Sequence, residues 1–195
     1  MSQPIGRREL FTRAFGLLRG TEDSSGSRRL PDGVLRPPGA VSEGELRRLC
    51  TSCGLCVAAC PHEAIRLLGP EAGELQGTPA VIPKQQPCQW CVDFPCVQAC
   101  PEGALRPELV KRGMGVARVV AGRCLLAQGM WCDECVQKCP LSGRAIRLEP
   151  GFRVTVDGSV CVGCGVCEFV CPVSPPAVRV RPLAESQSLV RTGTV

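Results

Sequence analysis

Cysteines are the residues of this sequence whose type and spacing could do chemistry. The chain has 195 residues, and 16 of them are cysteines. They fall into four groups of four, and in every group the last two are spaced C-x3-C and are followed by proline. The first group is Cys50, Cys53, Cys56 and Cys60, and the second is Cys88, Cys91, Cys96 and Cys100. The third group is Cys124, Cys132, Cys135 and Cys139, and the fourth is Cys161, Cys164, Cys167 and Cys171.

Groups one and four have the spacing C-x2-C-x2-C-x3-C-P, which is typical of bacterial ferredoxins. Three thiolates on so tight a loop can hold three corners of an Fe4S4 cube. We expect the fourth cysteine to lie on the short helix that follows and to ligate the neighbouring cube. The spacing therefore predicts that all sixteen cysteines are ligands of four [4Fe–4S] clusters.

The residues between the cysteines support this interpretation. Gly54 and Gly165 follow the second cysteine of their groups and permit backbone conformations that other residues avoid. Such loops are expected to direct backbone N–H groups at the sulfurs, which tunes the reduction potential. The proline after each group cannot continue a helix, so it turns the chain outward.

Two other uses of cysteine are less consistent with the sequence. Zinc sites usually use pairs of C-x2-C rather than triplets closed by C-x3-C-P, and His62 is the only histidine. Disulfides would need an oxidising compartment, and cysteines two residues apart have few good partners. The chain has only 5 Phe, 2 Trp and no Tyr, so clusters would have to supply part of the core.

The spacings leave open which groups share their clusters. In sequential pairing, group one joins group two and group three joins group four. In nested pairing, group one joins group four and group two joins group three. The identical spacings of groups one and four favour nesting, in which Cys171 completes the set of Cys50, Cys53 and Cys56.

The charge of the chain depends on these clusters. The formal net charge is +5, but each cluster with its four thiolates adds about −2. Residues 49–195 carry 14 basic and 12 acidic side chains, so four clusters would make this part acidic. This argues against a nucleic-acid partner and favours docking on a basic protein surface. No apolar run is long enough for a transmembrane helix.

The pattern along the chain predicts an α+β fold of two tandem bacterial 2[4Fe–4S] ferredoxin-like modules. A capping box predicts a helix over Ser42–Leu49, with Ser42 as N-cap and Glu45 at N3. Strands are expected before groups two to four, at Pro79–Lys84, Gly115–Val120 and Phe152–Val156. Short apolar strands are expected after each group, beginning at Ala64, Ala104, Ala145 and Ala177. We expect a basic N-terminal segment over residues 1–40, a four-cluster domain over 41–182 and a tail over 183–195.

No residues outside the cysteine groups suggest catalysis on an organic substrate. Trp90 and Trp131 each precede a cysteine, and local packing is a simpler explanation than electron coupling. His62 and Lys138 are expected to be surface residues, although Lys138 beside Cys139 could raise a cluster potential. We therefore expect a non-catalytic electron carrier or an accessory subunit of an oxidoreductase.

With the four groups in this order, the chain resembles the ferredoxin-type proteins of periplasmic nitrate reductase and methylamine-utilisation systems. The matching stretches include Leu35–Ala40, Cys50–Pro61, Pro87–Pro101, Met114–Gly115, the gap from Cys124 to Cys132, and Cys161–Pro172. The resemblance implies four [4Fe–4S] clusters and single-electron transfer within a respiratory or dehydrogenase complex. The partners it implies are a membrane quinol-oxidising protein, a molybdenum reductase or another reductase. It also allows a different role, that of a cytoplasmic maturation factor that assists cluster loading of a reductase.

The N-terminal segment bears on the compartment. Gly6–Phe11 is similar to a twin-arginine motif, but the apolar stretch after it, Ala14–Leu18, has only five residues. A working export signal needs an apolar stretch of about 7–15 residues. We therefore expect a cytoplasmic protein, with periplasmic export through a degenerate signal as the alternative. Phe11, Phe15 and Leu18 would also form one apolar face of a helix over Arg8–Leu18, and residues 20–33 are typical of a disordered linker.

Overall fold

The computed structural model describes residues 30–183, and the predicted helix over Arg8–Leu18 lies outside the described residues. Small helices and short strands alternate along the chain, as expected for a mixed α and β fold. The helices are α2 (Glu43–Leu49), α3 (Leu55–Ala58), α4 (Pro95–Gln98), α5 (Glu134–Gln137) and α6 (Val166–Phe169). Four further stretches are 3-10 helices: Pro70–Leu75, Pro107–Arg112, Ala121–Arg123 and Leu125–Gln128. The strands are β1 (Ile65–Leu67), β2 (Pro79–Val81), β3 (Gly115–Val119), β4 (Ile146–Glu149), β5 (Arg153–Val156) and β6 (Val178–Pro182).

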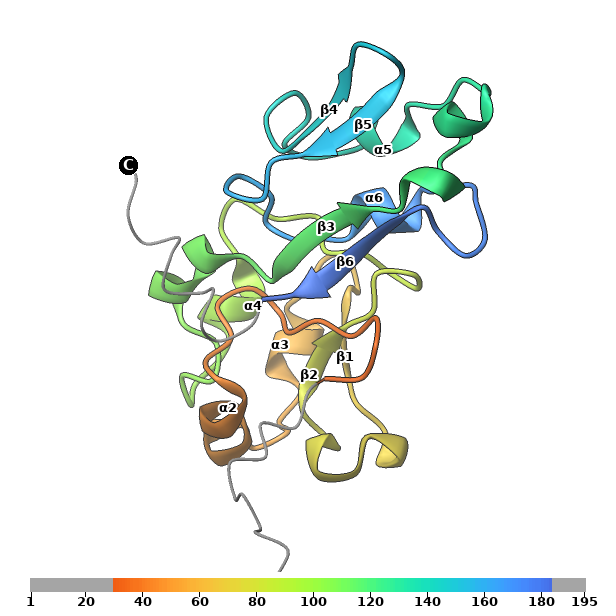
Figure 1. Ribbon diagram of the computed structural model, residues 1–195. Helices are drawn as coiled ribbons and strands as arrows, with labels where there is room; N and C mark the ends of the chain where they lie inside the picture. The colour runs from red at the N-terminus through yellow and green to blue at the C-terminus, as the bar shows by residue number, and fades with distance from the viewer. Residues whose placement is uncertain (1–29, 184–195) are drawn as a thin grey trace, which may run out of the picture.

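The strands form three separate antiparallel ribbons of two strands each. β1 pairs with β2, β3 with β6, and β4 with β5. In Figure 1 the β3–β6 ribbon crosses the middle of the molecule, with β4–β5 on one side of it and β1–β2 on the other. All six strands that the structure forms in residues 30–183 begin within one residue of a predicted start.

One predicted strand, the one starting at Ala104, does not form. Leu105 instead makes a single antiparallel bridge to Ala40. Pro107 begins a 3-10 helix two residues later, and Pro37 and Pro38 just before Ala40 lack the N–H groups that a longer ladder would need. The prediction of a strand after the second group is therefore wrong, because proline restricts the pairing on both sides.

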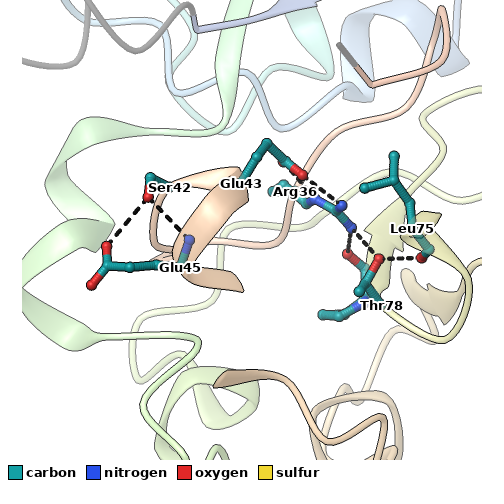
Figure 2. Close-up of polar contacts among 7 residues, drawn as sticks. Arg36, Ser42, Glu43, Glu45, Leu75 and Thr78 are labelled. Atoms are coloured by element: carbon teal, nitrogen blue, oxygen red, sulfur yellow. Dashed lines mark hydrogen bonds and ion pairs between the residues drawn. The ribbon is translucent and has the colours of Figure 1, made fainter. Parts of the chain in front are cut away.

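The predicted helix after Val41 is confirmed as α2, and its N-terminus is capped as expected. The Ser42 hydroxyl accepts a hydrogen bond from the Glu45 backbone N–H, and it donates to the Glu45 carboxylate. Figure 2 shows both contacts. Leu46 is the buried residue of this helix. The helix ends at Leu49, so that its C-cap is the first cysteine of group one, Cys50.

Cysteine side chains form part of the core. The main buried cluster contains aliphatic residues such as Leu35, Val81 and Ile146 together with six buried cysteines. These cysteines are Cys56, Cys96, Cys135, Cys161, Cys164 and Cys167. The apolar interior is thus built around the thiols. No helix among residues 30–183 has the length and apolar character needed to cross a membrane.

Candidate metal centres

Each cysteine group is built around a single turn of helix that carries its third cysteine. The third cysteines are Cys56 in α3, Cys96 in α4, Cys135 in α5 and Cys167 in α6. Our expectation that the fourth cysteine lies on this helix is wrong, since Cys60, for example, follows the end of α3 by two residues. The physical reason is the proline after it, because a residue before proline avoids the helical region.

Left-handed glycines start two of these helices, as predicted. Gly54 at the N-cap of α3 has φ +74°, and Gly165 at the N-cap of α6 has φ +89°. A Cβ at Gly54 would meet open space, whereas a Cβ at Gly165 would lie 2.6 Å from the Cβ of Pro83. Gly165 is therefore required both for its backbone angle and for a close approach between two chain segments.

The structure brings thiols together from neighbouring groups. One cavity is lined by Cys50, Cys53, Cys56 and Cys100. A second cavity is lined by Cys60, Cys88, Cys91 and Cys96. A third is lined by Cys139, Cys161, Cys164 and Cys167. The four remaining thiols are Cys124, Cys132, Cys135 and Cys171. The first two and Cys171 lie close enough to the buried Cys135 to help raise its pKa.

We call each of these four sets a quartet and number it after the group that supplies three of its thiols. The quartets show that the prediction of nested pairing is wrong. Cys100, and not Cys171, completes the set of Cys50, Cys53 and Cys56. The ribbons explain this result. β1 leaves group one and pairs with β2, which enters group two, and β4 and β5 connect groups three and four in the same way. Contacts between α3 and α4, and between α5 and α6, follow from these pairings.

Backbone N–H groups point at several of the sulfurs, as expected for these loops. Ala64 donates to Cys60 Sγ at 3.4 Å and Ala177 to Cys171 Sγ at 3.3 Å. Trp90 donates to Cys88 Sγ at 3.4 Å, and Ala117 to Cys161 Sγ at 3.5 Å. Such bonds stabilise negative charge on sulfur, so the loops are arranged to hold thiolates.

Burial acts in the opposite direction on the free thiols. It raises the pKa of Cys56 and Cys96 to about 11 and that of Cys135 to about 12, and neighbouring thiols add to each effect. Burial also raises the pKa of Cys88 to about 12, although the Trp90 N–H opposes the shift. These four thiols are therefore protonated at neutral pH when no metal is bound, and a cationic centre has to displace their protons to bind.

The donor set fits an iron–sulfur cluster. Soft thiolates are the ligands that such clusters use, and each cavity presents four of them from two chain segments. Across residues 30–183, no three or more Cys, His, Asp or Glu side chains are arranged to hold a single metal ion. The thiols surround the cavities, an arrangement suited to ligands at separate corners of a polynuclear centre.

The structure also places the two tryptophans, the histidine and the lysine that the sequence analysis named. Trp90 packs edge-on against Phe94, with ring centroids 5.0 Å apart, and Trp131 packs in the same way on Phe152 at 5.9 Å. His62 and Lys138 are exposed, as predicted. Trp90 thus packs within the loop of group two, whereas Trp131 is 64 % exposed and contacts an exposed Phe152.

Two buried charged residues were not predicted. Glu168, directly after Cys167, is 2 % exposed, and its Oε2 accepts a hydrogen bond of 2.7 Å from the Val180 N–H. This bond ties α6 to β6. Arg36 is also buried, and it belongs to the stretch Leu35–Ala40 on which the family resemblance partly rests. That resemblance could have indicated a structural role for Arg36, whereas the sequence around Glu168 contains no pattern that predicts its burial.

Comparison with known proteins places the chain among iron–sulfur proteins. Residues 49–104, which contain groups one and two, match the model of the 4Fe-4S dicluster domain. The chain is 44 % identical over 160 residues to the methylamine utilization ferredoxin-type protein MauM of Methylobacillus flagellatus, covering 76 % of this chain and 68 % of that protein.

Two relatives from Escherichia coli extend the match. The ferredoxin-type protein NapG is 39 % identical over 185 residues, covering 88 % of this chain and 78 % of NapG. The ferredoxin-type protein NapF is 31 % identical over 149 residues, covering 75 % of this chain and 85 % of NapF. The similarity thus extends well beyond the segment that matches the dicluster model.

Proposed function

Because this chain belongs to the family of ferredoxin-type iron–sulfur proteins that includes MauM and NapG, we propose that it carries four [4Fe–4S] clusters and relays single electrons within a respiratory or dehydrogenase redox complex. The observation that carries the proposal is the convergence of the sixteen thiols into four quartets. Each quartet takes three thiols from one group and the fourth from its neighbour, as paired clusters in bacterial ferredoxins require.

The repeated pairing of strands supports two tandem ferredoxin-like modules. In residues 30–105 the inner ribbon is β1–β2, and Ala40 before group one bridges to Leu105 after group two. In residues 115–182 the inner ribbon is β4–β5, and β3 before group three pairs with β6 after group four. The bridge at Ala40 therefore occupies the place in the first unit that the β3–β6 ribbon occupies in the second.

A bound [4Fe–4S] cluster supplies reversible one-electron exchange, and the protein supplies its surroundings. The thiols would hold the clusters, and the N–H groups of Ala64, Trp90, Ala117 and Ala177 would stabilise charge on the sulfurs. The apolar residues between the quartets keep water from the buried thiols. Partners of the kind implied by the resemblance are a membrane quinol-oxidising protein and a molybdenum or other reductase.

The test is analysis of protein purified without oxygen. We expect about 16 iron and 16 sulfide per chain, in keeping with four irons and four sulfides per cluster, and a broad brown absorbance band that bleaches on reduction. Zinc without acid-labile sulfide would reject the proposal. Rapid reduction by a quinol-linked membrane partner supports the relay, whereas a stable complex only with a cofactor-free reductase would assign the chain to maturation instead.

The compartment stays a prediction, because Gly6–Leu18 lies outside the described residues. Fractionation of cells that produce the full chain separates the cytoplasmic expectation from the periplasmic alternative. Export that stops when Arg7 and Arg8 are both changed to lysine would establish the alternative.

A further inference from the structure

A groove of about 890 Å³ runs beside the β3–β6 ribbon and is lined by parts of both predicted modules. Trp90 and Phe94 come from the loop of group two, and Val116 and Arg118 come from β3. Val160 and Val162, which flank Cys161, complete its apolar wall. Apart from its charged residues and Ser159, the groove is therefore lined by apolar residues and Gly158, with an aromatic pair among them.

The charges along this groove are all of one sign. Lys111, Arg118 and Arg144 line it, all three are exposed, and no acidic residue is among its described lining. Within residues 30–183, none of the three makes an ion pair. Arg147 and Arg181, in contrast, have acidic partners at 3.3 and 3.1 Å. The groove is thus a local concentration of uncompensated positive charge.

The sheet register adds an independent observation. Arg118 on β3 lies directly opposite Arg179 on β6, and no carboxylate in the described part of the chain pairs with either one. Like charges in directly opposed positions destabilise an antiparallel pair. β3 alternates buried Ala117 with exposed Arg118, so this charge lies on the outer face of the ribbon. An anion bound at this face would relieve the repulsion.

The groove also lies close to the thiols. The Trp90 N–H donates to Cys88 Sγ of quartet two, and Val160 and Val162 flank Cys161 of quartet four. A protein bound in the groove would therefore contact the loops of two quartets at once. This is the position that an electron-transfer partner needs, because the electron must pass over a short distance.

The ends of the chain do not match this groove in charge. Residues 1–29 carry six arginines and three acidic residues, so they would be repelled. Residues 184–195 follow Leu183 in the sequence, and they carry one acidic residue, Glu185, and one arginine, Arg191. Neither segment therefore has the net negative charge that would pair with the three cations of the groove.

We propose that this groove is the docking site for an acidic, partly apolar segment of a redox partner protein, an inference that rests on the proposed function. The carboxylates of the partner pair with Lys111, Arg118 and Arg144, and its apolar side chains pack on Trp90 and Phe94. The overall negative charge of the loaded protein does not prevent this. Lys111, Arg118 and Arg144 are exposed in the groove itself, so the carboxylates of a docked partner would contact these cations directly.

The test measures binding of a short dye-labelled peptide of glutamate and leucine to the loaded full chain, by fluorescence anisotropy at low and physiological salt. A variant with Lys111→Gln, Arg118→Gln and Arg144→Gln is expected to bind at least about tenfold more weakly, since clustered charges raise association by factors of about 10 to 1,000. The control carries Arg48→Gln, Arg66→Gln and Arg153→Gln, which remove the same charge at exposed positions outside the groove. It is expected to change binding less than about twofold.

Several results would overturn the proposal. One is an equal loss of peptide binding in the groove variant and the control variant. Another is equally strong binding of a peptide that has glutamine in place of glutamate. A third is peptide binding that occurs only after residues 184–195 are deleted. Binding of phosphatidylglycerol vesicles or duplex DNA through the same three cations, without peptide binding, would assign the groove to another partner and reject this one. Iron and sulfide are measured on the same samples. Their absence rejects the proposed function, whereas loaded variants with unchanged binding reject only the docking site.

Discussion

The backbone N–H of Cys88 donates a hydrogen bond of 3.0 Å to the carbonyl oxygen of Cys164. This bond joins the loops of groups two and four, whose thiols belong to different quartets. Met114 N–H donates to the Val162 carbonyl at 2.8 Å close by, and Pro83 packs on Gly165. The two predicted modules thus meet through backbone contacts at quartets two and four. If the chain relays electrons as proposed, we expect an electron to pass between the modules at this junction.

The junction can be tested at Gly165. Gly165→Ala forces a Cβ into the left-handed region and against Pro83, whereas Gly54→Ala has only the backbone cost. We expect a loss of about 1–2 kcal/mol for Gly54→Ala and about 1–3 kcal/mol more for Gly165→Ala, because overpacking adds to the strain. The measurement is guanidinium denaturation of the loaded protein, followed by backbone circular dichroism. Equal losses of unfolding free energy in the two variants would show that the contact with Pro83 does not contribute to stability.

The grouping of the thiols predicts how double variants lose iron. Cys56→Ala with Cys100→Ala removes two ligands from quartet one and should cost about four irons per chain. Cys56→Ala with Cys171→Ala affects quartets one and three and should cost about eight. Nested pairing predicts the opposite order. Iron analysis of the two purified variants therefore decides between the arrangements.

Arg36 should be the strongest single contributor among the polar residues around α2. Its guanidinium makes two bonds of 2.8 Å to the Glu43 carboxylate and further bonds to Thr78 and Pro79, as Figure 2 shows in part. Arg36→Ala leaves Glu43 without this partner and should cost about 2–3 kcal/mol, less than for a fully buried pair because Glu43 is 24 % exposed. Arg47→Ala breaks the exposed pair with Glu74 and should cost less than about 1 kcal/mol.

Thermal or urea unfolding of the two variants provides the comparison. If Arg36→Ala unfolds no more easily than Arg47→Ala, the segment Leu35–Ala40 is not held by this ion pair. A loss of about four irons per chain in the Arg36 variant, confined to quartet one, would show that α2 transmits the change to the thiols, because the C-cap of α2 is Cys50.

Removal of metal should unfold most of the chain. The core consists of thiols and small aliphatic residues, and binding of a cluster is coupled to folding when the ligands form the interior. After complete iron removal under reducing conditions, we expect the near-ultraviolet circular dichroism to be lost and the thermal transition to disappear. A cooperative melt of the metal-free protein at the temperature of the loaded protein would contradict this prediction.

Much of the local structure followed from neighbouring residues. Ser42 and Glu45 predicted α2, Gly54 and Gly165 predicted unusual backbone angles, and short apolar stretches before and after the cysteine groups predicted the six strands that form. These features depend on backbone preferences and on hydrogen bonds within a few residues. The type of metal ligand was likewise evident, because the chemistry of a thiol does not depend on the fold.

The tertiary structure alone decided which distant residues meet. The spacings of groups one and four are identical, yet Cys100 and not Cys171 joins Cys56, because β1 pairs with β2 and brings groups one and two together. Burial of Arg36 and the opposition of Arg118 and Arg179 also arise from contacts between segments 42 and 61 residues apart. Such contacts depend on which apolar surfaces and strand edges pack against each other. The spacing of the cysteines along the chain does not predict that packing.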